Sequence, residues 1–168
     1  TVASDGFGNV YIAGEFTGTA SFGSTELTSV GDRDVFIAKL DPSGNWLWAV
    51  QVEDDGGRFD DFADGIAVDS AGSVYVTGTF AASATFGSVT LDSAGVQDMF
   101  VAKLNTAGNW LWATGLGTEF SDDGYGVAVD SVGSAYVTGH QFGIAFAAKL
   151  DTNGAVLWEK GIGEGTGY

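Results

Sequence analysis

Cysteine is absent from this chain of 168 residues, and proline and histidine occur once each. No disulfide framework is therefore expected, and a lone histidine supplies too few nitrogen or sulfur ligands for a zinc site. No apolar run approaches the roughly 18 residues that a membrane span requires. The absence of cysteine fits bacterial secretion and a reducing cytosol equally well, so it does not indicate the compartment.

Basic residues are also scarce. The chain has 6 Lys and Arg and 22 Asp and Glu, which gives a net charge of −16. Such a chain would be repelled by nucleic acid and by an anionic membrane surface, so neither is an expected partner. The acidity has two interpretations, which are a surface charged for solubility and the binding of divalent cations. With 45% hydrophobic and only 17% charged residues, the composition argues against disorder.

What the chain has in excess is glycine, 27 residues, together with 13% aromatic residues. This combination is typical of many short strands joined by tight turns. The first residue is Thr1 and not Met, so we expect a processed form or a piece of a longer protein.

Two blocks of sequence recur three times along the chain. The first block, Ala-x-Asp-x-x-Gly-x-x-Tyr-x-x-Gly, begins at Ala3, Ala67 and Ala128, at steps of 64 and 61 residues. The second block, Phe-x-Ala-Lys-Leu-Asx-x-x-Gly, begins at Phe36, Phe100 and Phe146, at steps of 64 and 46 residues. The third copy is therefore about 15 residues short, and a 46-residue step is close to the length of a four-stranded propeller blade.

Each copy is predicted to hold four strands, called A to D. In the second copy the expected strands are 65–69, 73–80, 99–104 and 109–114, in which Val, Ile, Tyr, Phe and Trp are frequent. Both faces of strand C are largely apolar, as expected for a sheet that lies between two others.

An Asx-x-x-Gly sequence separates strands A and B, and a second one separates C and D. Asp or Asn suits the first position of a type I turn, and glycine suits the left-handed position that follows. These hairpin turns explain the repeated Asp residues without a metal. The six turns begin at Asp5, Asp41, Asp69, Asn105, Asp130 and Asp151.

Copies one and two carry an additional segment between strands B and C, at 20–27 and 84–91. We interpret it as a lengthened B–C hairpin with an apolar cluster. The clusters are Phe16, Phe22 and Leu27 in copy one, and Phe80, Phe86 and Leu91 in copy two. In copy three the segment is replaced by the four residues 140–143.

The two blocks together resemble the bacterial SBBP-type β-propeller repeat over nearly the whole chain. The segment from Leu40 to Trp48 is also similar to the tryptophan-docking motif of quinoprotein propellers. The first resemblance implies secreted or surface-attached proteins of bacteria and archaea, and it carries no catalytic motif.

The expected fold is all-β, a β-propeller with three four-stranded blades. We place blade 1 at 1–56, blade 2 at 57–118 and blade 3, with its short B–C hairpin, at 119–168. Propellers close with about four to eight blades, so three leave two apolar faces bare. Gly165–Tyr168 followed by Thr1–Asp5 reproduces the pattern of Asp123–Asp130. We therefore expect either half of a six-bladed ring made by two chains or part of a longer propeller.

One acidic stretch, 53–64, and its counterpart 119–123 lie where strand D leads to the next strand A. Clustered carboxylates in a glycine-rich loop can supply several of the six to eight oxygens that calcium takes. The alternative is a solvated acidic loop, and the spacing does not match an EF-hand. The candidate calcium ligands are Asp60, Asp61, Asp64, Asp122 and Asp123.

Other residues that could carry chemistry are expected to be structural. His140 has no serine or cysteine partner in a recognisable triad, and we expect it in a loop. Tryptophans at the same place in every copy are expected to pack between blades, and the repeated lysines are expected at a structural edge. They are Trp46, Trp48, Trp110, Trp112 and Trp158, with Lys39, Lys103 and Lys149.

These patterns predict a non-catalytic extracellular module, secreted or at the cell surface, for protein or glycan interaction or scaffolding. The expected site is the loop-bearing face or the B–C hairpins, where the copies differ most. We predict no catalytic residue and no cofactor, with calcium as the exception above. Two alternatives remain open: a structural repeat of a surface filament or stalk, and an enzyme, a lyase or quinoprotein-like, with a channel site completed by other blades. Partners are protein or carbohydrate, and further blades from a second chain or the same longer chain.

Overall fold

A computed structural model describes residues 1–30, 33–54 and 61–163. These residues form seventeen strands and no helix, so within this part of the chain no helix could cross a membrane. Asp60 and the segment 165–168 lie outside the described residues. The all-β prediction is confirmed.

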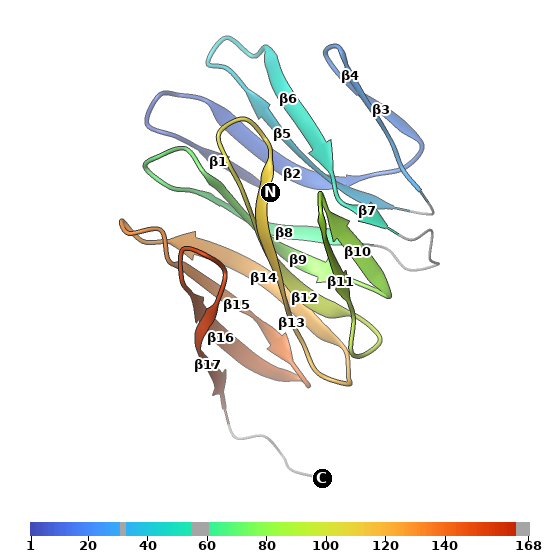
Figure 1. The fold of residues 1–168 in the computed structure, drawn as a ribbon, viewed down its shortest axis with the longest axis vertical. Helices are drawn as coiled ribbons and strands as arrows, with labels where there is room; N and C mark the ends of the chain where they lie inside the picture. Colours follow the sequence, from blue (N-terminus) through green and yellow to red (C-terminus); the bar gives the residue numbers. More distant parts are fainter. Residues whose placement is uncertain (31–32, 55–60, 164–168) are drawn as a thin grey trace.

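Three four-stranded antiparallel sheets are stacked one on another, and each takes its strands in chain order (Figure 1). Blade 1 consists of β1 (Val2–Ser4), β2 (Val10–Phe16), β5 (Asp34–Leu40) and β6 (Trp46–Gln51). Blade 2 consists of β8 (Phe62–Val68), β9 (Val74–Phe80), β12 (Asp98–Leu104) and β13 (Trp110–Leu116). Blade 3 consists of β14 (Asp122–Val129), β15 (Ala135–Gln141), β16 (Ile144–Leu150) and β17 (Val156–Ile162).

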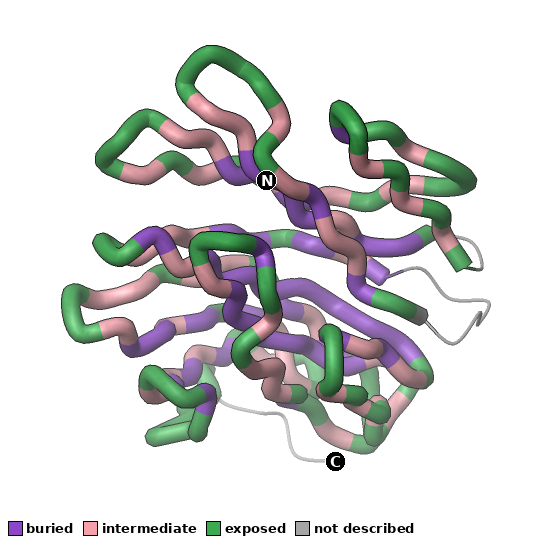
Figure 2. The backbone as a smooth tube through the Cα atoms, turned by 45° about the horizontal axis from the view of Figure 1, so that its top comes forward, coloured by how far each residue is buried: buried purple, intermediate pink, exposed green. Residues whose placement is uncertain are grey.

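Burial follows the position of each blade in the stack. Strands β9 and β12 of the middle blade are buried at every residue, because a sheet covers each of their faces. In β2 and β15 of the outer blades buried residues recur at alternate positions, as expected when one face is covered. Every residue of β17 is exposed. Figure 2 shows the buried backbone gathered in the middle of the molecule.

The Asx-x-x-Gly turns form as predicted. At the turn between β8 and β9, one carboxylate oxygen of Asp69 accepts hydrogen bonds of 2.9 Å from the amides of Ala71 and Ser73. Gly72 then has a φ of +82°, a conformation that favours glycine. The other five turn glycines have φ between +82° and +85°, so the same local chemistry closes all six hairpins.

The additional B–C segments of blades 1 and 2 form separate hairpins and do not extend the sheets of their blades. Strands β3 (Thr19–Phe22) and β4 (Thr25–Thr28) make the first hairpin, and β10 (Ser83–Phe86) and β11 (Val89–Asp92) make the second. The predicted apolar clusters lie beneath them, with Phe86 5.0 Å from Phe100 between ring centroids.

The prediction of loops at both acidic stretches is partly wrong. Residues Glu53–Asp54 form β7, which pairs with β10 of the next blade. Strand β8 begins at Phe62 and not at the predicted Gly65. A bulge between Ala63 and Gly65 shifts the register by one residue, and Phe62 and Ala63 still pair with β9 on the N-terminal side of the bulge. Strand β14 likewise begins at Asp122 and bulges between Gly124 and Gly126.

Candidate functional site: the hairpin face

One end of the blades carries nearly all the differences between the three copies. Here strand A begins, strand B ends and strand C begins, since Phe62 pairs with Thr79 and Asp98 pairs with Phe80. The two hairpins and β7 lie at this end (Figure 1). We call it the hairpin face. The six Asx-x-x-Gly turns occupy the opposite end of the blades.

Asp61 and Asp122, two of the predicted calcium ligands, hold equivalent structural positions on the hairpin face. Asp122 accepts a 2.9 Å hydrogen bond from the amide of Phe142, and its other oxygen accepts from the hydroxyl of Thr118. Asp61 accepts from the amide of Ala81 at 3.2 Å. Both carboxylates are buried, and each connects the start of strand A to the B–C connection of its own blade.

A second pair of buried carboxylates, Asp34 and Asp98, was not identified from the sequence. They begin the equivalent strands β5 and β12, and each stands two residues before the second repeated block. Their separation of 64 residues, the same as that of the blocks, is the signal that could have revealed them. Asp98 accepts a hydrogen bond of 2.7 Å from the amide of Ala94, while its second oxygen, Oδ1, is buried with no hydrogen-bond partner among the described residues. Its carboxyl lies directly against the backbone of Gly117.

Burial raises the pKa of Asp98 above its ordinary value, and the nearby charge of Asp122 raises it further. The folded protein therefore binds a proton at Asp98 more tightly than the unfolded chain does. The charged carboxylate opposes folding at neutral pH, and that cost disappears as the pH falls through the folded pKa towards the unfolded one.

We expect Asp98→Asn to raise the melting temperature at pH 7 by a few degrees. The amide removes the repulsion from Asp122 and keeps an acceptor oxygen for the Ala94 N–H. Because the wild-type carboxyl becomes protonated at low pH, the gain should shrink as the pH approaches 4. Melting curves between pH 4 and 7 in EDTA measure both effects.

The same melting curves, repeated in millimolar calcium chloride, separate this account from a cation site. A calcium-dependent stabilisation of the wild type that Asp98→Asn abolishes would contradict the prediction and would support a calcium site on the hairpin face. Among the described residues, no group of three or more Asp, Glu or His side chains lies close enough to hold a metal ion.

The remaining predicted ligands that the structure describes are Asp64, which is exposed, and Asp123, which is half-buried. Partial desolvation raises the pKa of Asp64, and the charges of Glu15 and Asp123 raise it further. Asp123 accepts a 2.6 Å hydrogen bond from the side-chain amide of Gln97. Calcium binding by these carboxylates stays a prediction.

An exposed aromatic pair marks the hairpin face where blades 2 and 3 meet. Phe120 precedes β14, Phe142 follows β15, and their ring centroids are 4.2 Å apart. Phe120 is 45% and Phe142 49% exposed, and the neighbouring Val96 is 60% exposed. Phe142 also has a φ of +52°, which is uncommon and strained for a residue with a side chain.

His140 lies in β15 and not in a loop, so that prediction is wrong. It pairs across the sheet with Asp123, at the place that Thr79 holds in β9, because strand B has the same seven-residue length in all three blades. Its ring nitrogen Nδ1 lies 3.3 Å from the hydroxyl of Tyr125. Among the described residues, His140 has no serine hydrogen bond of the kind that a triad needs.

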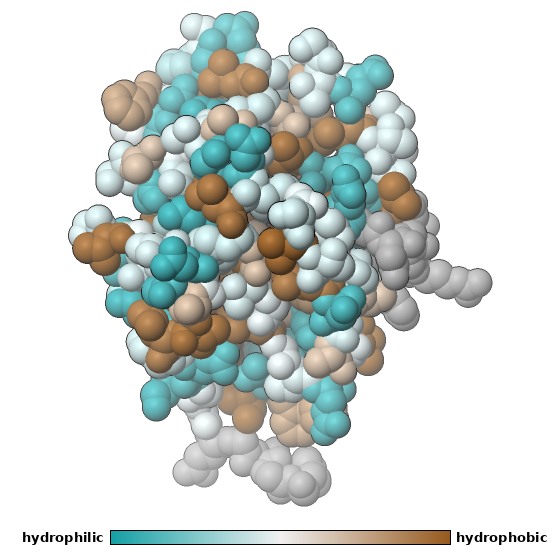
Figure 3. All heavy atoms as spheres, in the orientation of Figure 1, coloured by the Kyte–Doolittle hydropathy of each residue, from teal (hydrophilic) through white to brown (hydrophobic). Residues whose placement is uncertain are grey.

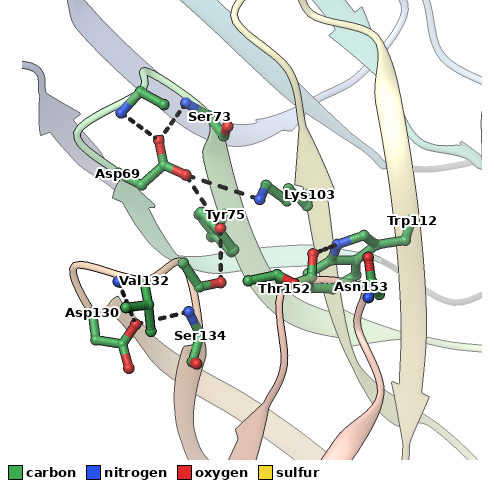
Figure 4. Close-up of polar contacts among 12 residues, drawn as sticks. Asp69, Ser73, Tyr75, Lys103, Trp112, Asp130, Val132, Ser134, Thr152 and Asn153 are labelled. Atoms are coloured by element: carbon green, nitrogen blue, oxygen red, sulfur yellow. Dashed lines mark hydrogen bonds and ion pairs between the residues drawn. The ribbon is translucent and has the colours of Figure 1, made fainter.

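In each copy the repeated lysine lies over the ring of the repeated tyrosine, and the repeated aspartate lies beside them. Figure 4 shows this group in blade 2. The ammonium of Lys103 lies 4.7 Å from the ring centre of Tyr75 and 3.9 Å from Asp69. Lys39 over Tyr11 and Lys149 over Tyr136 repeat this arrangement. The structural interpretation of the lysines is confirmed, although the ammonium groups lie over tyrosine rings, and Lys39 and Lys103 are buried.

Two of the tryptophans pack between blades as predicted. Trp48 of blade 1 donates its indole N–H to the carbonyl of Thr106 in blade 2, at 3.1 Å. Trp112 of blade 2 donates to the carbonyl of Thr152 in blade 3, at 3.0 Å (Figure 4). Trp46 and Trp110 instead pack against Phe22 and Phe86 under the hairpins.

Comparison with known proteins gives the same architecture. The family model described as a β-propeller repeat, SBBP, matches residues 111–140. An uncharacterized WD repeat-containing protein of Acanthamoeba polyphaga mimivirus is 31% identical over an alignment 134 positions long, which covers 72% of this chain and 9% of that protein. The crystal structure of a protein of unknown function from Bacteroides caccae superposes with a TM-score of 0.51 at 13% identity. That superposition covers 95% of this chain and 44% of the other.

Proposed function

Because this chain carries the SBBP-type β-propeller repeat, we propose that it is a non-catalytic binding or scaffolding module of a secreted or cell-surface protein. Its contact surface is the hairpin face, and its partner is a protein or a glycan. The chain spans 9% of the curated relative and 44% of the solved chain, and this partial coverage supports a role as one part of a larger propeller or assembly.

The observation that carries the proposal is the pair Phe120 and Phe142. Two phenylalanine rings in contact, tilted by 42° and each about half exposed, offer an apolar surface that is not needed to fill the interior of a blade. Phe142 and Gly143 are the two residues of the tight turn between β15 and β16, and both have positive φ, so the hairpin turn fixes the place of the Phe142 side chain. Aromatic side chains supply much of the contact energy of binding surfaces.

Polar groups follow this aromatic pair along the sheet, where Gln97 pairs with Ser121, the residue after Phe120. The carboxylate of Asp123 and the amide of Gln97 are hydrogen-bonded to each other, and Tyr125 is 51% exposed nearby on β14. An aromatic platform with oriented acceptors beside it suits a sugar ring or an apolar side chain flanked by basic groups. The acidic charge of the chain favours a neutral or basic partner.

Binding is tested on a glycan array and a protein microarray with the fluorescently labelled chain. We expect retention on one of the two, and at least tenfold weaker binding for the double variant Phe120→Ser with Phe142→Ser. Phe7→Ser is the matched control, because Phe7 is 80% exposed but lies in an Asx-x-x-Gly turn at the opposite end of the blades.

Two results would overturn the proposal. Blank arrays for the wild-type chain would contradict a binding role. Equal weakening by Phe7→Ser and the double variant would show that binding does not use the hairpin face. Melting curves of all variants establish that each is folded before binding is compared.

A further inference from the structure

Both junctions between blades use the same two complementary faces. One blade presents a tyrosine and a tryptophan, and the next presents the glycines of its two Asx-x-x-Gly turns. We call these the tyrosine–tryptophan face and the turn face. The tyrosine–tryptophan face is formed by Tyr11 and Trp48 in blade 1, by Tyr75 and Trp112 in blade 2, and by Tyr136 and Trp158 in blade 3. The turn face contains Gly8 and Gly44 in blade 1, Gly72 and Gly108 in blade 2, and Gly133 and Gly154 in blade 3.

The fit between the two faces is close at both junctions. A methyl group built on Gly108 would come within 2.8 Å of the Trp48 ring, and one on Gly154 within 2.7 Å of the Trp112 ring. Each of these tryptophans also donates its N–H to the carbonyl two residues before the glycine. At the second junction Tyr75 donates to the carbonyl of Gly133, at 3.0 Å (Figure 4). Only glycine fits beneath the indole.

The tyrosine–tryptophan face of blade 3 is complete, but no other described residues cover it as a blade covers the first two. Trp158 is 40% exposed, and an apolar hollow of about 330 Å³ is bordered by Val127, Tyr136, Ala147 and Trp158. The hydroxyl of Tyr136 lies 3.1 Å from Asp130, and Lys149 lies over its ring, as in the covered blades. Figure 3 shows apolar atoms at the lower end of the molecule, where blade 3 lies.

The turn face of blade 1 is open in the matching way. A methyl group built on Gly44 would meet no atom within 4 Å, in contrast to Gly108 and Gly154. Val2 of blade 1 is 66% exposed, whereas the equivalent Ile66 of blade 2 is 9% exposed. Each end of the stack therefore offers one half of an interface that the chain already makes twice.

We propose that blade 3 docks onto blade 1 of a second copy of this chain through these two faces. In the docked pair the indole N–H of Trp158 donates to the carbonyl of Pro42, which is equivalent to Thr106 and Thr152. The Trp158 ring then covers Gly44. Two copies joined in this way at both ends make a closed assembly of six blades, within the range of about four to eight that propellers use.

The inference rests on the propeller assignment that underlies the proposed function, but it needs no ligand. A failure of docking would leave binding at the hairpin face intact, and blank arrays would leave docking intact. The two proposals are thus tested by separate measurements.

Sedimentation of the whole chain, followed from about 1 to 100 µM, tests the docking. We expect a species of twice the 17.2 kDa chain mass. Trp158→Ala and Val2→Asp each alter one of the two faces, and each should raise the dissociation constant at least tenfold. The matched control is Leu157→Asp. Leu157 is 55% exposed and its counterpart Leu111 in the fully covered blade 2 is 52% exposed, so this position remains in solvent beside a docked blade.

Several outcomes would overturn the inference. A single copy at every concentration, or a mass other than that of two copies, would contradict it. Weakening by Trp158→Ala without weakening by Val2→Asp would show that blade 3 contacts something other than blade 1. Equal weakening by Leu157→Asp would show that the effect is not specific to these faces. Because all three positions are exposed, the variants are expected to fold, which their melting curves verify.

Discussion

Replacing Gly78 with alanine is expected to lower the free energy of unfolding by about 3 kcal/mol. Gly78 lies in β9 opposite the bulge of β8, and an added methyl group would collide with the carbonyl of Phe62. The clash is with backbone, so no side-chain rotation relieves it. Either the β8–β9 pairing or the bulge must open, and urea denaturation at 25 °C measures the loss.

Gly14 provides the matched control in blade 1. It occupies the equivalent place in β2, but a methyl group there would meet only the edge of the Phe36 ring, at 3.3 Å. We expect Gly14→Ala to change stability by less than about 1 kcal/mol, since alanine is no worse than glycine in an unobstructed strand. Equal losses for the two variants would contradict the account based on the bulge.

Phe100→Ala is expected to cost about 3–5 kcal/mol. Phe100 is fully buried in the middle blade, where its ring packs against Phe86 with centroids 5.0 Å apart. Truncation leaves a cavity enclosed by a blade on one side and a hairpin on the other, so collapse of the surroundings is restricted. Chemical denaturation with an unchanged m-value identifies the loss as one of packing.

The equivalent substitution in blade 1, Phe36→Ala, should cost about half as much. Phe36 also packs beneath a hairpin, 5.0 Å from Phe22, but it is only partly buried because no blade covers that side of blade 1. The comparison is made in the Trp158→Ala background, so that a single copy is measured. An equal loss of unfolding free energy in Phe36→Ala and Phe100→Ala would contradict the conclusion that the outer face of blade 1 is exposed.

Local chemistry explains why so much of the fold was predictable from sequence. An Asx-x-x-Gly turn forms through contacts within five residues, as at Asp69 and Ser73, so its outcome needs no distant partner. The repeated Trp112 was predicted to pack between blades, and the repeated Lys103 to lie at a structural edge, because three copies of one pattern imply three equivalent environments. The strand positions followed from the same turns, with errors where a bulge extended β8 and β14.

The candidate site depended on contacts between segments far apart in the chain. Asp98 and Asp122 are brought together only when blade 3 stacks on blade 2, and their repulsion leaves no pattern in either segment alone. The pairing of β7 with β10 joins the end of blade 1 to a hairpin of blade 2, two segments about 30 residues apart in the chain. Neither contact has a local signal.

By itself the sequence determined the repeat, the strand order within a blade and the turns, because these depend on neighbouring residues and on the alternation of apolar side chains. Only the tertiary structure decided which surfaces remain bare. Phe120 and Phe142 meet because two connections converge on the hairpin face, and Trp158 is open while Trp112 is covered although their sequences are alike. Whether a residue is buried depends on which other segment packs against it. The sequence of one segment alone does not specify that partner.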